Sequence, residues 1–332
     1  MIGIARRSGL AEFVLTTGLA LALVLLVASM PAAARQPVAP GSGGASAFDP
    51  RVVVTIKPLH ALVAGIMRGR GRPILLIPAD ISPHRQGLMP SQARALRRAR
   101  LVFRIGPDFE ITLNKPIAVL ATRARVVALM RAPGLRLLPA RAGGVWSRAA
   151  RTTPPSATTA DPHIWLDPAN ARAMVSAIVA ALADMDPSHA RAYARNGAAL
   201  EARLAALDRS LRQSLRSLVG RPFIVFHDAY QYFTTRYGLR AVGALTVAPG
   251  RGAGARRLAR IRRRIRSSKI RCVFTEPQVT PRLARAAVAG TGARLAVLDP
   301  LGAALPTGPD AYFALLRGLV TSLRDCLGDA GN

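Results

Sequence analysis

The sequence predicts an α/β fold of two similar lobes, each with a central parallel sheet flanked by helices, joined by one long linker helix. Short β-branched runs alternate with amphipathic segments in both halves of the chain, which is typical of parallel sheets. One leucine stripe at helical spacing separates the two halves. The expected boundaries are residues 50–185 for the first lobe, 186–219 for the linker and 220–332 for the second lobe.

The first 34 residues have the parts of an export signal peptide. Arg6 and Arg7 supply a positive region, residues 13–28 are an apolar run, and residues 32–34 are three alanines suited to cleavage. The apolar run is short for a membrane span, which needs about 20 residues; an uncleaved anchor is the alternative. Residues 35–49 are expected to be a flexible leader. We therefore expect the mature protein in the periplasm.

The first lobe contains short apolar runs that predict buried strands. These strands are expected at residues 52–56, 74–77, 101–105 and 126–129. Amphipathic stretches predict helices near residues 61–67 and 91–98. Residues 143–160 are rich in Ser, Thr, Pro and Arg and have no apolar periodicity, so they predict a mobile loop.

The linker helix has recognisable ends. Asp186 suits the N-cap, Pro187 the first helical position, and Gly220 with Pro222 ends the helix. Its apolar stripe consists of Leu200, Leu204, Leu207, Leu211, Leu215 and Leu218. The second lobe then repeats the pattern, with strands expected at residues 223–226, 241–247, 270–274 and 295–298.

The chain carries a formal net charge of +30, and 44 of its 47 basic residues are arginine. These arginines are spread along the chain, which favours a coding bias over a nucleic-acid surface. Residues 251–271 are denser, with ten basic residues and no acidic one. Leu258, Ile261 and Ile265 form an apolar stripe there, which predicts a helix with a solvated outer face. The alternatives are contact with an anionic membrane or a docking partner; without interleaved aromatic residues, nucleic acid is not expected.

Three of the five histidines lie near the expected carboxyl ends of strands or at helix starts. They are His84, His163 and His227, separated by 79 and 64 residues. These separations exclude a zinc-finger hairpin and suit a site between lobes, where open α/β folds bind ligands. Any one of them alone is compatible with a structural role. Imidazole is a common zinc ligand, and Asp161, Asp167 and Asp228 are candidate partners for the second ring nitrogen.

Six motifs occur in order along the chain. They are Thr55–His60 (TIKPLH), Ser82–His84 (SPH), Met89–Ser91 (MPS), Asp161–Pro168 (DPHIWLDP), Phe226–Tyr230 (FHDAY) and Phe274–Gln278 (FTEPQ). Together they resemble the zinc-binding (ZnuA-type) substrate-binding proteins of bacterial ABC importers, in the cluster A-I metal-binding family. The resemblance runs from about residue 50 to 329, nearly the whole mature chain.

The resemblance implies two pseudo-symmetric lobes joined by one long rigid linker helix. It also implies a metal held by His84, His163 and His227, with a water or the Asp299 carboxylate as the fourth ligand. His60 is a possible cleft residue, although packing is the preferred interpretation. Three imidazoles favour Zn²⁺ over the harder Mn²⁺, while Cu²⁺, Ni²⁺ and Co²⁺ stay open. An even cysteine count in an exported protein favours a disulfide over free thiols or metal ligands, and Cys272 and Cys326 stand where the family has one.

We therefore expect a non-catalytic monomer that captures periplasmic Zn²⁺ and delivers it to the transmembrane subunit of an ABC permease. The permease is expected to be the protein's only contact with the membrane. One alternative is a His₃ zinc hydrolase or lyase, for which Glu276 is the obvious base. Another is a degenerate paralogue acting through its cationic surface. Two departures from the family keep that alternative open: residues 142–160 contain neither His nor Asp, and Arg85 follows the His84 motif.

Overall fold

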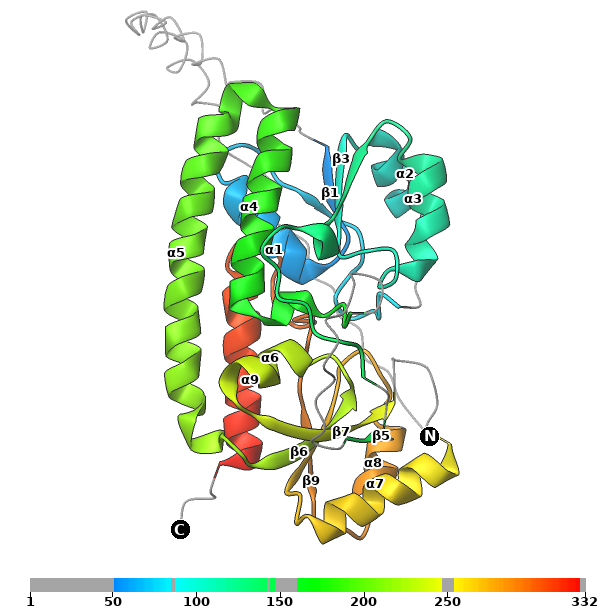
Figure 1. Ribbon diagram of the computed structural model, residues 1–332. Helices are drawn as coiled ribbons and strands as arrows, with labels where there is room; N and C mark the ends of the chain where they lie inside the picture. The colour runs from blue at the N-terminus through cyan, green and yellow to red at the C-terminus, as the bar shows by residue number, and fades with distance from the viewer. Residues whose placement is uncertain (1–50, 85–86, 142–143, 147–159, 247–253, 329–332) are drawn as a thin grey trace, which may run out of the picture. The chain divides into compact units, whose positions relative to one another are not determined.

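The computed structural model (Figure 1) describes residues 51–84, 87–141, 144–146, 160–246 and 254–328. The predicted signal peptide, the leader, Arg85 and most of the predicted loop at 143–160 lie outside these residues. In the part of the chain that is described, no helix is both long and apolar enough to cross a membrane.

The first sheet has four parallel strands in the order β2-β1-β3-β4. The strands are β1 (Val52–Val54), β2 (Ile74–Leu75), β3 (Leu101–Arg104) and β4 (Arg125–Ala128). The helices that accompany them are α1 (Lys57–Ile66), α2 (Pro90–Arg98) and α3 (Asn114–Leu120). Both faces of the sheet are covered, as is usual for parallel strands: Val52 and Val54 pack into the main core with α1, and Val53 packs beneath α2 and α3.

The second sheet has five strands in the order β5-β7-β6-β8-β9. Its strands are β5 (Gly144–Val145), β6 (Pro222–His227), β7 (Arg240–Thr246), β8 (Cys272–Thr275) and β9 (Arg294–Val297). The last four are mutually parallel, whereas β5 is antiparallel to β7. The short helices nearby are α6 (Gln231–Tyr237), α7 (Ala255–Ser267) and α8 (Arg282–Val288), and α7 and α8 cover one face.

Strand β5 corrects the prediction of an unstructured loop that begins at residue 143. Gly144 pairs with Ala244 of β7, so a segment from the first half of the sequence joins the second sheet. This approach requires glycine at position 243, because a Cβ there would lie 2.5 Å from the Gly144 carbonyl oxygen. A two-residue strand of this kind has no periodicity that the sequence could reveal.

The long helix α5 (Ala190–Leu215) lies beside α4 (Pro168–Met185) along one part of its length and beside α9 (Ala311–Leu327) along the other (Figure 1). Helix α5 is the predicted leucine-striped helix, and it packs against α1 as well as α9. Its start differs from the prediction, since Pro187–His189 forms a 3-10 turn and the Asp186 carboxylate accepts side-chain rather than backbone hydrogen bonds. The predicted fold class is confirmed, and the Cys272–Cys326 disulfide joins β8 to α9.

Candidate metal site

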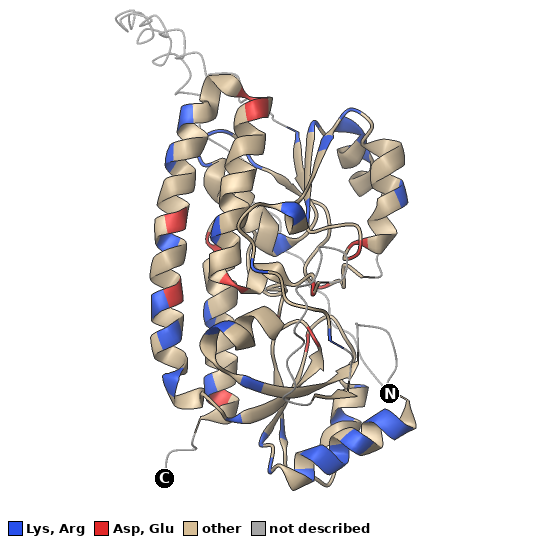
Figure 2. Cartoon of the chain, in the orientation of Figure 1, with Lys and Arg blue, Asp and Glu red and all other residues tan. Residues whose placement is uncertain are grey.

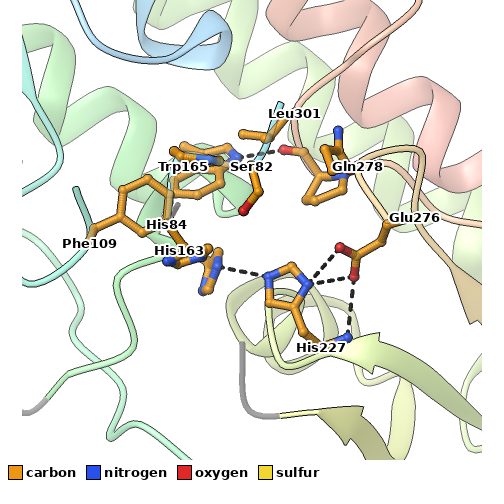
Figure 3. Close-up of a pocket in the computed structure, with 11 residues that line it drawn as sticks. Ser82, His84, Phe109, His163, Trp165, His227, Glu276, Gln278 and Leu301 are labelled. Carbon is orange, nitrogen blue, oxygen red and sulfur yellow. Dashed lines mark hydrogen bonds and ion pairs between the residues drawn. The ribbon is translucent and has the colours of Figure 1, made fainter. Parts of the chain in front are cut away.

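The structure gathers the three predicted histidines around one point (Figure 3). One nitrogen from each of His84, His163 and His227 lies within 4.8 Å of the others. His84 comes from the loop after β2, His163 precedes the 3-10 turn Ile164–Leu166, and His227 ends β6. The site therefore joins the loops of the first sheet to the carboxyl edge of the second.

The cavity between these rings is small and mostly apolar. Its volume is about 10 Å³, close to the space that one water molecule needs. The Phe109 ring lies edge-on to His84, with ring centroids 4.7 Å apart, and the Trp165 ring centroid lies 5.2 Å from that of His163. The cavity can hold a single ion with little surrounding water, and it is too small for an organic substrate.

Two buried carboxylates fix the orientation of two of the rings. Asp161 accepts a hydrogen bond from His163 Nδ1 at 2.7 Å, and Glu276 accepts one from His227 Nδ1 at 2.6 Å. A carboxylate that accepts from Nδ1 leaves the Nε2 lone pair free to bind a metal. The two Nε2 atoms face each other across 3.2 Å.

Two lone pairs at this distance need a cation between them. Tetrahedral zinc with Zn–N bonds of about 2.05 Å would place its nitrogen ligands about 3.3 Å apart. The separation of 3.2 Å between His163 and His227 therefore matches one edge of a zinc tetrahedron. Without metal, a proton shared between the two nitrogens would also remove the repulsion between their lone pairs.

Burial and neighbouring charges set the protonation of the site. Burial, with the other two histidines, lowers the pKa of His84 to about 2, and burial holds the pKa of His163 well below its usual value. Burial also opposes a charge on His227, but the Glu276 carboxylate outweighs it, so the pKa of His227 is raised. Burial raises the pKa of Asp161 to about 7. His84 and His163 are thus neutral imidazoles near neutral pH, and His227 keeps its proton to a higher pH than either of them.

Asp299, the predicted fourth ligand, does not join the three histidines. Its carboxylate accepts hydrogen bonds from the backbone N–H groups of Leu301, Gly302 and Ala303 and from the Gln278 amide. These contacts hold Asp299 as the cap of a turn. His60 is also absent from the group of candidate ligands found among the described residues, because it lies on α1 and donates to the Pro73 carbonyl oxygen at 3.0 Å.

Two of the three predicted histidine partners are wrong. Asp167 caps α4 through the Ala169 N–H, and Asp228 is paired with Arg141. Asp161 is the partner that was correctly predicted. The partner of His227 is Glu276, which follows β8, and β8 lies beside β6 in the sheet. The ends of neighbouring parallel strands meet at one edge, so the order of the strands was the signal that the sequence lacked.

Comparison with known families agrees with this geometry. The family model described as "Zinc-uptake complex component A periplasmic" matches residues 52–326. This chain belongs to that family. The matched range contains all three histidines of the site and both cysteines of the disulfide.

Individual relatives extend the comparison. The chain is 41% identical over 304 residues to the high-affinity zinc uptake system protein ZnuA of Brucella abortus (strain 2308), covering 83% of this chain and 91% of the relative. It is 34% identical over 306 residues to the protein of the same name in Paracoccus denitrificans (strain Pd 1222), with coverages of 86% and 94%. A crystal structure of ZnuA superposes with a TM-score of 0.70 at 26% identity, covering 83% of this chain and 98% of that one.

Proposed function

We propose that this protein captures Zn²⁺ in the periplasm with His84, His163 and His227 and delivers it, as a monomer, to the transmembrane subunit of an ABC permease. The observation that supports this most is the opposed pair of Nε2 atoms, each on a ring fixed by a buried carboxylate. The relatives' name, high-affinity zinc uptake system protein, agrees with zinc as the cargo.

The ligand set favours zinc over harder divalent ions. The candidate group consists of three imidazoles and no carboxylate, whereas Mn²⁺ and Mg²⁺ prefer oxygen ligands. A water is the fourth ligand we propose, because Asp299 is committed to its turn. Ser82 Oγ and Gln278 Oε1 are buried without a hydrogen-bond partner, and both residues line the cavity. These two oxygens can hold that water.

The geometry does not favour a zinc hydrolase. Besides the histidines, Glu276 is the only ionisable side chain among the described residues that line the cavity. Both of its carboxylate oxygens lie within hydrogen-bond distance of His227 Nδ1, at 2.6 and 2.7 Å. A general base must reach a metal-bound water, and Glu276 is held on the far side of the ring. The assembled triad likewise argues against a paralogue that has lost its metal site.

The test is a competition titration of the metal-free mature protein with Zn²⁺ and a chromophoric chelator. We expect one tight equivalent, weakened by more than about 100-fold in His227→Ala, since loss of a ligand should exceed the loss of a ligand's hydrogen-bond partner. His60→Gln, which replaces a histidine outside the site, should bind like the wild type. Equal affinity of His227→Ala and the wild type would contradict the proposal.

Delivery is tested separately by zinc uptake. Cells that keep the permease but lack their own zinc-binding protein should regain uptake at low external zinc when they express the wild type. His227→Ala should not restore it. Restoration by both proteins would show that the histidine site is not the source of the delivered zinc.

A further inference from the structure

Helix α7 is the most basic helix described, and its burial is one-sided. Seven of its 13 residues are arginine. Ile261 and Ile265 are its buried side chains, and they pack into the core over the second sheet. The helix is therefore fixed to the protein by one apolar stripe, and its opposite face is open.

That opposite face is a row of guanidinium groups. Arg256, Arg260 and Arg263 are exposed and follow one another at helical spacing. We call these three residues the α7 face. Helix α7 is about 20 Å long, and Figure 2 shows repeated blue segments along it and no red one.

Few carboxylates are available to neutralise the α7 face. The sequence has no Asp or Glu between Asp228 and Glu276, and none between Glu276 and Asp299. Glu276 itself is buried against His227. The adjoining helix α8 adds two exposed arginines, Arg282 and Arg285, and no acidic side chain.

Two of the five arginines on α5 do have carboxylate partners. On α5, Arg203 pairs with Asp310 and Arg212 with Asp208. None of the described ion pairs involves an α7 arginine; the polar contact described there runs from Arg262 to the Ala289 carbonyl oxygen. A general arginine bias explains the number of arginines, but it does not explain why those of α7 are left without carboxylates.

We propose that the α7 face binds the anionic phospholipid head groups of a membrane surface. Guanidinium groups suit phosphodiesters, which they can contact through two parallel hydrogen bonds. The exposed residues of α7 are arginine, alanine and serine, with no aromatic or large apolar side chain, whereas a specific protein interface is usually centred on such side chains. A row of arginines matches a flat anionic membrane surface better than it matches a shaped pocket on a protein.

This contact would be additional to the permease, which the sequence led us to expect as the only membrane contact. It does not depend on the zinc site, because neither α7 nor α8 contributes a residue to the zinc cavity. An electrostatic contact of this kind would concentrate the protein near the membrane and would weaken with salt.

Vesicle flotation tests the proposal with the full mature protein. We expect binding to phosphatidylcholine vesicles that contain phosphatidylglycerol and none to pure phosphatidylcholine. The variant Arg256→Gln/Arg260→Gln/Arg263→Gln should bind about a hundredfold more weakly, since each of three basic residues near an anionic surface strengthens binding about fivefold.

The matched control removes the same charge from exposed positions on α5. Arg191→Gln/Arg195→Gln/Arg209→Gln should stay within about twofold of the wild type if the location of the charge decides binding. Equal weakening of both triple variants would overturn the proposal in favour of net charge alone. The proposal would also be overturned if the α7 variant floated like the wild type. A third contrary result is a variant that loses binding only to vesicles that contain the permease, because the α7 face would then bind an acidic protein surface rather than lipid.

Discussion

The Nε2 atoms of His163 and His227 lie 3.2 Å apart, with Nδ1 of each ring bonded to a buried carboxylate. This relationship joins a loop of the first half of the chain to a strand of the second. A cation between the two rings, whether zinc or a shared proton, removes the repulsion between their lone pairs. Zinc binding should therefore hold together the two parts of the chain that supply these histidines.

Glu276→Gln tests the carboxylate behind His227. The amide is the same size but carries no charge, so the His227 ring loses its strongest electrostatic partner. Zinc affinity should fall by about 10–100-fold, as is usual when a ligand's hydrogen-bond partner is altered. The pKa of His227 in the metal-free protein should also fall, which NMR titration measures. Glu201→Gln on α5, a change of the same type outside the cavity, should alter neither quantity.

The pH dependence of zinc binding should reflect the protons that His227 and Asp161 take up. Glu276 raises the pKa of His227, so the metal-free protein holds that proton to higher pH than an ordinary histidine would, and zinc must displace it. His84, with a pKa of about 2, and His163, with a strongly lowered pKa, are already neutral. Zinc affinity should thus fall about tenfold per pH unit below the raised pKa of His227, and up to about a hundredfold per unit where Asp161, with a pKa of about 7, also takes up a proton. Competition titrations between pH 5.5 and 8 would contradict this if affinity were constant or fell about a thousandfold per unit.

The same shifts predict how the stability of the metal-free protein changes with pH. His227 binds its proton more tightly in the folded state, so this contribution is present below the unfolded pKa of about 6.5 and is lost as pH rises through the folded pKa. In His227→Gln, the unfolding temperature should no longer show the decline that the loss of this proton causes as the pH rises. An unchanged pH profile in this variant would show that His227 does not retain the proton.

Asp299→Asn tests whether the Asp299 carboxylate stabilises a turn or binds the metal. The Asp299 carboxylate caps the turn that ends at Ala303 and also accepts from Gln278, so its loss should lower the free energy of unfolding by about 1–3 kcal/mol. Zinc affinity should stay within about threefold of the wild type. Chemical denaturation and zinc competition measure the two effects. A loss of zinc affinity as large as that of His227→Ala would instead show that Asp299 binds the metal.

The Cys272–Cys326 disulfide should stabilise the fold without affecting zinc. The two cysteines are 54 residues apart in sequence, and closing such a loop in the unfolded chain contributes about 4 kcal/mol in the chain-entropy account. Cys272→Ser/Cys326→Ser should therefore unfold at a clearly lower temperature but bind zinc with near-normal affinity at 25 °C. The expectation fails if calorimetry finds the same unfolding temperature for the variant and the oxidised wild type.

Features with strong local patterns could be predicted from the sequence. The three histidines stand in distinctive short motifs, and Asp161 lies two residues from the ring that it holds. The leucine stripe of α5 predicted its buried face, because helical spacing repeats over many turns. Helix α9 carries a comparable apolar stripe and was overlooked, although its buried residues recur at the same spacing.

Features that depend on distant pairing could not be predicted in this way. Glu276 reaches His227 because β8 lies beside β6, and the order of strands is a tertiary property. Asp299 was predicted as a ligand from its motif, but its oxygens satisfy the backbone of the turn that follows it. Strand β5 exists because Gly243 allows close approach, and its own two residues carry no pattern.

The most direct test of the account is a crystal structure of the zinc-loaded protein with anomalous scattering measured at the zinc edge. We predict one anomalous peak within about 2.0–2.1 Å of the Nε2 atoms of His163 and His227 and of one His84 nitrogen. A water beside Ser82 should complete the tetrahedron. A peak bound by the Asp299 carboxylate, or one located away from these three rings, would contradict the central claim.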